Sequence, residues 1–207
     1  MQRYRISSFQ KNFVINELMV LAWAASVQRA DVYKAAPNPA DSQVLKFRKG
    51  VFNFIQDLIP QYVNGCDEQT HIENLQALVD HATAMGSPIL AGKVYRIGVA
   101  QKLLNLVLKY IWCSGFIAKP PHCPVDRIVL KMGEASTDIC WTQMRSMDEY
   151  LLAIRELRRR ADAELQLLAD WELTHYRRRA GDFLDVQQVT TVRDTRLAIF
   201  GQKARFV

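Results

Sequence analysis

The sequence predicts an all-α protein, built as a single compact helical domain around a buried central helix. Apolar residues recur at three- and four-residue steps in successive segments, which is the period of an α-helix. Several of these segments follow a serine or an aspartate that can cap a helix N-terminus. We expect a helical domain over residues 1–185 and a tail over residues 186–207, extended or with a short β-structure, packed on that domain.

Length and composition agree with one globular domain. The 207 residues suffice for one sizeable core and are too few for a second independent one. An apolar fraction of 49% and a charged fraction of 23% are globular averages. The formal net charge of +6 and the pI of about 9.2 indicate a moderate basic bias, compatible with nucleic acid or another anionic partner.

The cysteines and the apolar runs bear on the compartment. The four cysteines lack any Cys-x-x-Cys spacing, so we expect reduced thiols, no metal site and no cofactor. The N-terminal residues do not form the apolar core of a secretory signal. No apolar run reaches the roughly 18–20 residues of a membrane span. We therefore expect a cytoplasmic protein without a membrane partner.

Two helices are predicted in the first third of the chain. Ser7 or Ser8 can cap a helix over Phe9–Gln28, and Asp41 or Ser42 can cap a second over Gln43–Ile59. The expected apolar face of the first helix consists of Phe13, Leu18, Leu21 and Ala25. That of the second consists of Val44, Phe47, Val51, Phe54, Ile55 and Leu58.

The middle of the chain predicts three more helices. Asp67 precedes a helix over Glu68–Met85, and Gly86 stands where a left-handed C-terminal cap is expected. Gln101–Trp112 is apolar nearly all round, which is typical of a buried central helix. A short helix is expected from Asp126 to Met132.

The last predicted helix is the longest. Ser146 and Glu149 form the capping-box pattern, which starts a helix over Met147–Arg178. Its expected inner face includes Leu165, with arginines on the outer face. These arginines can contact phosphates or form a solvated helix face.

Two short motifs flank the predicted central helix. Gly98-Val99-x-x-Lys102 lies at its start, and Pro124-Val125-Asp126 follows it downstream. In this order they resemble the helix-hairpin-helix (HhH-GPD) DNA glycosylase superfamily, which includes the oxoguanine glycosylases. In that family a hairpin of the form Gly-Val-Gly-x-Lys binds the DNA backbone, and the aspartate begins a helix. Here Ala100 replaces the second hairpin glycine, and the usual Leu-Pro lead-in is missing.

The resemblance implies a catalytic pair. Lys102 would be the Schiff-base nucleophile, and Asp126 the carboxylate that activates it and stabilises positive charge on the sugar. A carboxylate beside an oxocarbenium-like sugar stabilises the transition state, and an amine attacks only when it is neutral. The hairpin residues implied to contact the DNA backbone through free N–H groups are Gly98, Val99, Ala100 and Gln101.

Further DNA contacts are predicted from position and residue type. The cations near the motifs in sequence are candidates for phosphate contacts: Lys93, Arg96, Arg127 and Arg145. A glycosylase must extrude its target base, so we expect aromatic or polar side chains around that base. The candidates for this base pocket are His122, Trp141 and Phe116.

The sequence thus predicts a DNA glycosylase, with or without lyase activity, that acts on double-stranded DNA containing a damaged or modified base. The base is either an endogenous lesion, in DNA repair, or a modification of foreign DNA, in antiviral defence. Two alternatives stay open, a non-catalytic helical DNA-binding protein and a helical interaction or regulatory protein. The first keeps the hairpin but performs no chemistry, and in the second the hairpin match is accidental. The plain structural interpretation of the motifs is that Gly98 lies inside a single helix from Lys93 to Trp112, with Lys102 a solvated side chain and Asp126 only a helix cap.

Overall fold

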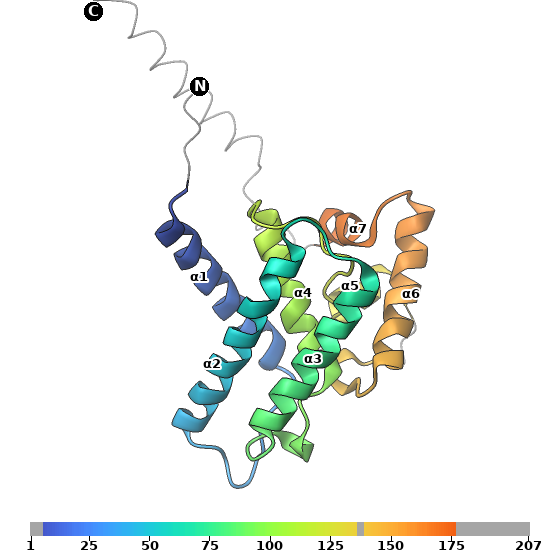
Figure 1. Cartoon of the computed structure of the whole chain (residues 1–207). Helices are drawn as coiled ribbons and strands as arrows, with labels where there is room; N and C mark the ends of the chain where they lie inside the picture. The colour runs from blue at the N-terminus through green and yellow to red at the C-terminus, as the bar shows by residue number, and fades with distance from the viewer. Residues whose placement is uncertain (1–5, 136–138, 177–207) are drawn as a thin grey trace, which may run out of the picture. The chain divides into compact units, whose positions relative to one another are not determined.

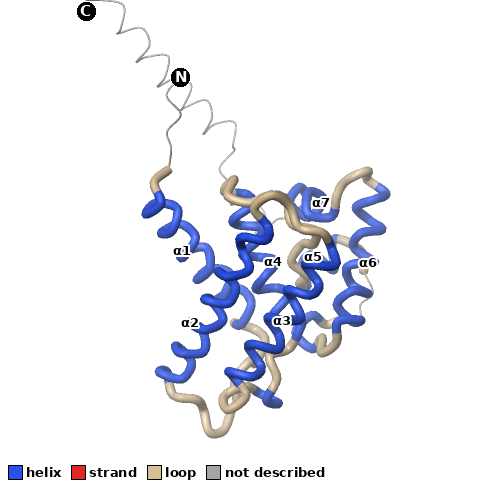
Figure 2. The backbone as a smooth tube through the Cα atoms, in the orientation of Figure 1, coloured by secondary structure: helices blue, strands red, loops and turns tan. Residues whose placement is uncertain are grey.

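The computed structural model describes residues 6–135 and 139–176, and this part of the chain is helical. Figures 1 and 2 show helices joined by loops, and no β-strand forms among the described residues. The predicted all-α class is confirmed. The α-helices are α1 (Ser8–Val27), α2 (Asp41–Leu58), α3 (Glu68–Gly86), α4 (Ile97–Cys113), α5 (Arg127–Met132), α6 (Met147–Ala163) and α7 (Leu168–His175). Short 3-10 turns occupy Ile59–Tyr62, Ala91–Lys93 and Trp141–Gln143.

Helix α4 is the centre of the core, as its composition predicts. It contacts α1, α3, α6 and the Trp141–Gln143 turn. In Figure 1 it runs behind α3, with α1 and α2 to one side and α6 and α7 to the other. Because neighbours surround it, 13 of its 17 residues are buried, including Gln101, Lys102, Asn105 and Lys109. Buried polar groups need partners. Lys109 pairs with Glu172 of α7, whereas Gln101, Lys102 and Asn105 organise the site.

Most helix starts lie where the capping residues predict them. Asp67 caps α3 by accepting a hydrogen bond from the Thr70 N–H at 2.9 Å. Ser146 and Glu149 form the predicted capping box of α6. The start of α2 differs, because its N-cap is Ala40 and its first helical residue is Asp41.

Gly86 is required for packing, and its prediction as a left-handed cap is wrong. It is the last residue of α3, and a Cβ there would lie 2.4 Å from the Phe47 ring and 2.7 Å from Leu90. Glycine therefore lets α3 approach the aromatic side chain of α2 closely.

The buried face of α1 differs from the predicted one. Phe13 and Leu21 are 66% and 54% exposed, whereas Met19, Ala22 and Trp23 are buried. Both sets have helical spacing, so the period alone does not choose between them. The Trp23 ring contacts the rings of Phe47 and Phe52 edge-on, which turns that face of α1 toward α2.

The predicted long helix over Met147–Arg178 is broken. Leu165 adopts a left-handed φ of 56° and is 96% exposed, so its predicted place on the inner face is wrong. The Gln166 N–H donates to the Ala161 carbonyl at 3.0 Å, which closes α6 with a C-terminal capping turn. The break lets α7 fold back and bury Trp171.

Two further predictions concern the membrane and the tail. No helix of the described residues is long and apolar enough to cross a membrane. The predicted tail over residues 186–207, and the domain boundary before it, lie outside the residues that the structure describes.

Candidate active site at the start of helix α4

Lys102 and Asp126 meet beside the first turns of α4. The Lys102 Nζ lies 3.2 Å from the Asp126 Oδ2, and the two side chains are only 11% and 12% exposed. Lys102 comes from α4, whereas Asp126 ends the loop that precedes α5. The two motifs therefore supply one ion pair, which water reaches only at its edge.

Each oxygen of the Asp126 carboxylate has its own contacts. Asp126 is the N-cap of α5, and its Oδ1 accepts hydrogen bonds from the N–H groups of Ile128 at 2.9 Å and Val129 at 3.1 Å. Its Oδ2 faces Lys102. Capping thus fixes the orientation of the carboxylate and leaves one oxygen directed at the amine.

The ring of Trp141 covers the ammonium group of Lys102. The Nζ lies 4.2 Å from the ring centroid, a cation–π contact. The segment around Trp141 packs against the start of α4, because the Gly98 N–H donates to the Met144 carbonyl at 3.3 Å. Lys102 therefore lies between a carboxylate and an aromatic face.

Two buried amides attach the loop before Asp126 to α4. The Gln101 Oε1 accepts from the Val125 N–H at 3.0 Å, and its Nε2 donates to the Val125 carbonyl at 2.7 Å. One turn further on, the Asn105 Nδ2 donates to the Cys123 carbonyl at 3.1 Å. Both amide side chains are fully buried. We call residues 123–126 the strap.

A buried network extends from Asn105 to the surface. The Asn105 Nδ2 also lies 3.0 Å from the Tyr150 hydroxyl, which is 2.8 Å from the His122 Nδ1. The His122 Nε2 is 3.0 Å from the Glu68 carboxylate, which also pairs with Arg158. Burial lowers the pKa of His122, so we assign the neutral tautomer that donates from Nε2 and accepts at Nδ1.

The predicted phosphate contacts gather in two places. Arg96 is the N-cap of α4, and burial together with the charge of Arg145 lowers the pKa of its guanidinium. Lys93, which precedes α4, and Arg145, which lies far downstream in the sequence, are both exposed. Arg127 follows Asp126 and lines a cavity of about 550 Å³ with Ile128, Lys131 and Met132. Lys93 and Arg96 thus precede α4, Arg127 begins α5, and Arg145 lies directly before the N-cap of α6.

The expected DNA contacts of the Gly98–Gln101 segment are not available in this conformation. These four residues are buried in the first turns of α4. The N–H of Gly98 already donates to Met144, and those of Val99 and Ala100 donate to the Arg96 carbonyl. The predicted free hairpin N–H groups at these residues are therefore wrong, because the segment is helix packed under the Trp141–Met144 loop.

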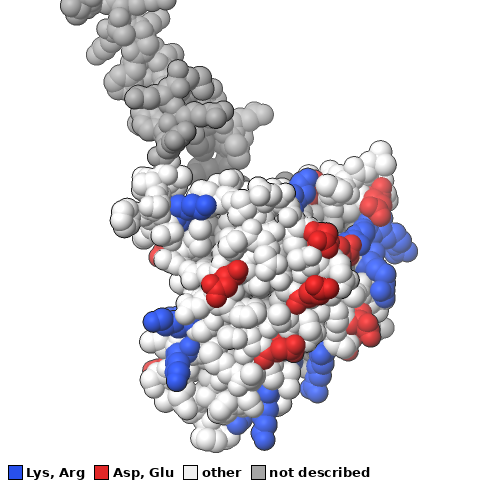
Figure 3. All heavy atoms as spheres, viewed as in Figure 1, with Lys and Arg blue, Asp and Glu red and all other residues white. Residues whose placement is uncertain are grey.

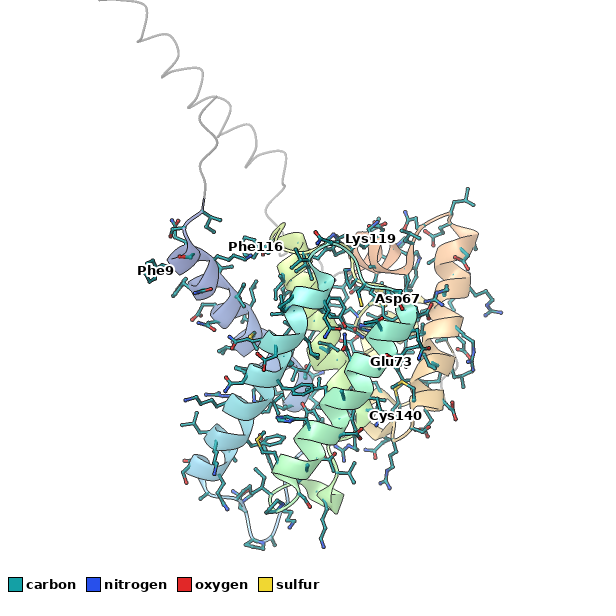
Figure 4. The ribbon with its side chains drawn as sticks, viewed as in Figure 1. Phe9, Asp67, Glu73, Phe116, Lys119 and Cys140 are labelled. Carbon is teal, nitrogen blue, oxygen red and sulfur yellow. The ribbon has the colours of Figure 1, made fainter. Side chains whose placement is uncertain are left out.

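Two of the three predicted base-pocket residues are placed elsewhere. His122 is fully buried and both its ring nitrogens have partners, so it belongs to the core network. Phe116 follows the far end of α4, where Lys11 lies over its ring at 5.0 Å. Figure 4 shows Phe116 near Lys119 at one end of the molecule and Cys140, next to Trp141 in sequence, toward the other. Only Trp141 lies at the pair.

The sequence contained a signal for the amides that the predictions missed. Gln101 and Asn105 are the two amide residues of this mainly apolar helix and are four apart, so they lie on one helix face. A buried amide needs partners, and unpaired backbone groups of a nearby loop can supply them. Their partners on the strap come from a distant part of the sequence, which no helical period identifies.

The face shown in Figure 3 carries interspersed acidic and basic side chains, without a continuous basic patch over its described residues. Within the described ranges, no cluster of three potential ligands could hold a metal ion.

Comparison with known proteins finds no matching family model, no similar curated protein and no similar solved structure. The site must therefore be interpreted from its own geometry.

Proposed function

We propose that this protein is a DNA glycosylase that excises a damaged or modified base, with Lys102 as nucleophile and Asp126 as its activating carboxylate. The observation that supports this function most directly is the contact of 3.2 Å between the Lys102 Nζ and the Asp126 Oδ2. A largely buried ion pair is seldom the most stable choice, because two charges lose their hydration. Helix α4 also contributes to a second buried pair, Lys109–Glu172, whose carboxylate is only 2% exposed. In the Lys102–Asp126 pair both side chains keep an exposed edge that a substrate can reach, which favours a chemical role for this pair.

The proposed reaction uses both groups in sequence. Lys102 gives its proton to the Asp126 Oδ2 and becomes a neutral amine. Its Nζ then forms a bond to the sugar C1′, while the C1′–N bond breaks and its electron pair leaves with the base, which takes up a proton. The proton that the departing base takes up is the one held by Asp126, and the carboxylate restored in this way stabilises the positive charge that develops on the sugar. The nitrogen then loses a second proton, the C1′–O4′ bond breaks as the ring oxygen takes up a proton, and a protonated imine joins Lys102 to C1′.

In this proposal Trp141 covers Lys102 in the free protein and stacks on the extruded base in the complex. Its ring covers the ammonium group in the free protein, so the ring must leave before a sugar can reach the Nζ. The displaced indole is then free to stack on the extruded base. The cations Arg127 and Lys131 on α5, and Arg145 beyond Trp141 in sequence, would contact the flanking phosphates.

Borohydride trapping tests the proposal. The full chain is incubated with duplexes that each contain one modified base, including oxidised, deaminated, alkylated and phage-type hypermodified bases. We expect a covalent protein–DNA product with at least one of them. Lys102→Ala should abolish trapping and keep duplex binding, and Asp126→Asn should slow base release by about 10²-fold or more.

Lys119→Ala is the matched control, because Lys119 pairs with Asp170 after the far end of α4. It should trap like the wild-type protein. Salt-dependent binding without base release on any duplex would instead indicate a non-catalytic DNA-binding protein. Neither binding nor release would favour an interaction protein, in which the ion pair is structural.

A further inference from the structure

The strap is held to α4 by side chains that flank the catalytic pair in both sequence and space. Gln101 directly precedes Lys102, and Val125 directly precedes Asp126. The Gln101 amide bonds both backbone groups of Val125 and also donates to the Gly98 carbonyl at 2.9 Å. One amide therefore connects the first turn of α4 to the residue before Asp126.

Asn105 attaches the other end of the strap. Its Nδ2 lies 3.1 Å from the Cys123 carbonyl and 3.4 Å from the Gln101 Oε1. The two amides are thus in contact with each other and with both ends of the strap. The Tyr150 hydroxyl, which His122 holds in turn, bonds Asn105 from the other side, and all three side chains are fully buried.

We propose that Gln101 and Asn105 are positioning residues, which set the strap against α4 so that the Asp126 carboxylate faces the Lys102 amine. This inference rests on the proposed function for its catalytic consequence. Capping alone turns the Asp126 carboxylate toward α5 and does not determine the distance from α5 to α4. The two hydrogen bonds between Gln101 and Val125 determine that distance. Each of these two residues is the direct neighbour of one member of the ion pair.

The chemistry of Gln101 allows a sharp test. Its Oε1 accepts and its Nε2 donates, so an isosteric Gln101→Glu variant retains the acceptor and loses the donor when the introduced carboxyl is ionised. An ionised carboxyl would also face the carbonyl oxygens of Gly98 and Val125. Once protonated, the carboxyl can donate again. Gln101→Met has a similar size and can do neither at any pH.

Two measurements are made on the full chain. The first is the single-turnover rate of base release, together with the dissociation constant for an uncleaved duplex. The second is made without DNA and follows the ¹⁵N ammonium NMR resonance of Lys102. This resonance is assigned because it disappears in Lys102→Arg. An ion-paired ammonium exchanges slowly enough to observe, and Asp126→Asn gives the spectrum of the unpaired state.

We expect Gln101→Met to lose the Lys102 resonance and to slow base release by about 10²-fold, because a misplacement of about 1 Å at a reacting group costs this much. Duplex affinity should change by less than about threefold. Gln101→Glu should behave like Gln101→Met at high pH and recover both the resonance and the rate as pH falls. Asn74→Leu is the control, since Asn74 is a buried amide that bonds Gln61 and Tyr62 and not the strap.

The outcomes separate this inference from the proposed function. A retained Lys102 resonance and a wild-type rate in Gln101→Met would overturn the positioning role. A rate lost in Gln101→Glu at all pH values, with the resonance unchanged, would also overturn it. If the wild-type protein releases no base, yet the resonance responds to Gln101 as expected, the proposed function fails and the positioning of the ion pair stands.

Discussion

The carbonyl oxygen of Trp141 occupies the space where Gly98 would carry a side chain. A Cβ on Gly98 would lie 1.7 Å from that oxygen and 3.2 Å from the Met144 Cβ. The glycine therefore permits a close backbone approach inside a helix. This approach places the Trp141 ring over Lys102, so a small residue at the start of α4 determines how the site is covered.

Gly98→Ala should destabilise the protein by about 2 kcal/mol. The new methyl group meets a backbone oxygen that cannot move without shifting the loop, and overpacking of this kind costs about 1–3 kcal/mol. The higher helix propensity of alanine offsets less than about 1 kcal/mol of this cost. Urea denaturation measures the change.

Gly50→Ala is the matched control for this substitution. Gly50 lies within α2, and a Cβ there meets only the flexible end of the Met85 side chain. Its effect should be within about 1 kcal/mol of zero. Equal losses in the two variants would contradict the role assigned to the Trp141 carbonyl.

The cation–π contact should appear as a coupling energy between Lys102 and Trp141. We expect about 1 kcal/mol from a double-mutant cycle of Lys102→Met and Trp141→Leu, since the contact is largely desolvated. Lys119 and Trp112 supply the control cycle, because their separation is 5.9 Å and Lys119 is one-third exposed. Stability is measured by denaturant unfolding of each variant. A Lys102–Trp141 coupling no larger than that of the control would exclude the contact in solution.

The sequence predicted helices and caps well because both depend on neighbouring residues. The caps at Asp67, Asp126 and Ser146 involve bonds to N–H groups two or three residues on, so their signals are local. The predictions failed where tertiary contacts decide. Which face of α1 is buried depends on its packing against α4 and on the rings of α2, and the break at Leu165 depends on where α7 packs.

The same distinction applies to the site. Lys102 and Asp126 are paired in the sequence analysis because their motifs, in this order, resemble those of the glycosylase superfamily. It assigned Gly98–Gln101 to an exposed hairpin, since nothing local reveals the Trp141–Met144 loop above them. His122 was placed at a pocket for its chemistry, although Tyr150 and Glu68, its partners, are remote in sequence.

Acid should destabilise the protein below about pH 6.5 through His71. Burial lowers the pKa of His71 from 6.5 to about 3. Between these pH values the unfolded chain binds a proton at this residue and the folded chain does not. The unfolded state binds more protons in this window, so the free energy of unfolding falls as pH falls. Where the imidazole is protonated in the unfolded chain and neutral in the folded chain, each pH unit of acidification lowers the free energy of unfolding by about 1.4 kcal/mol.

His71→Gln should remove that part of the pH dependence. The amide can still accept from the Tyr62 hydroxyl, which now lies 2.9 Å from the His71 Nδ1. Free energies of unfolding from urea titrations between about pH 5 and pH 6.5 should show a slope smaller by about 1 kcal/mol per pH unit, because the unfolded histidine is only partly protonated near pH 6.5. His81→Gln, on the same helix and stacked on Phe54, is the control. An unchanged slope in His71→Gln would contradict the burial of a neutral imidazole.

Leu165→Gly should stabilise the protein by about 0.5–1 kcal/mol. The left-handed φ of 56° at Leu165 costs a residue with a Cβ about 1 kcal/mol or more, and its 96% exposed side chain adds little packing. The greater freedom of glycine in the unfolded chain offsets part of this gain. Leu167→Gly, at an exposed position with a φ of −71°, should destabilise instead. Thermal unfolding of both variants decides the sign.

Arg127 and Lys131 should contribute to DNA binding through phosphates. They lie four residues apart on α5 and line one cavity next to Asp126. Each phosphate contact contributes about 0.9 to the slope of log affinity against log salt. Arg127→Ser with Lys131→Ser should therefore lower this slope by about 1–2 on an unmodified duplex. The control is Lys46→Ser with Lys49→Ser, two exposed residues of α2, which Figure 1 shows on the other side of α4 from α5. Because both double variants remove two positive charges, an equal fall in the control would mean that net charge, rather than a site beside Asp126, governs DNA affinity.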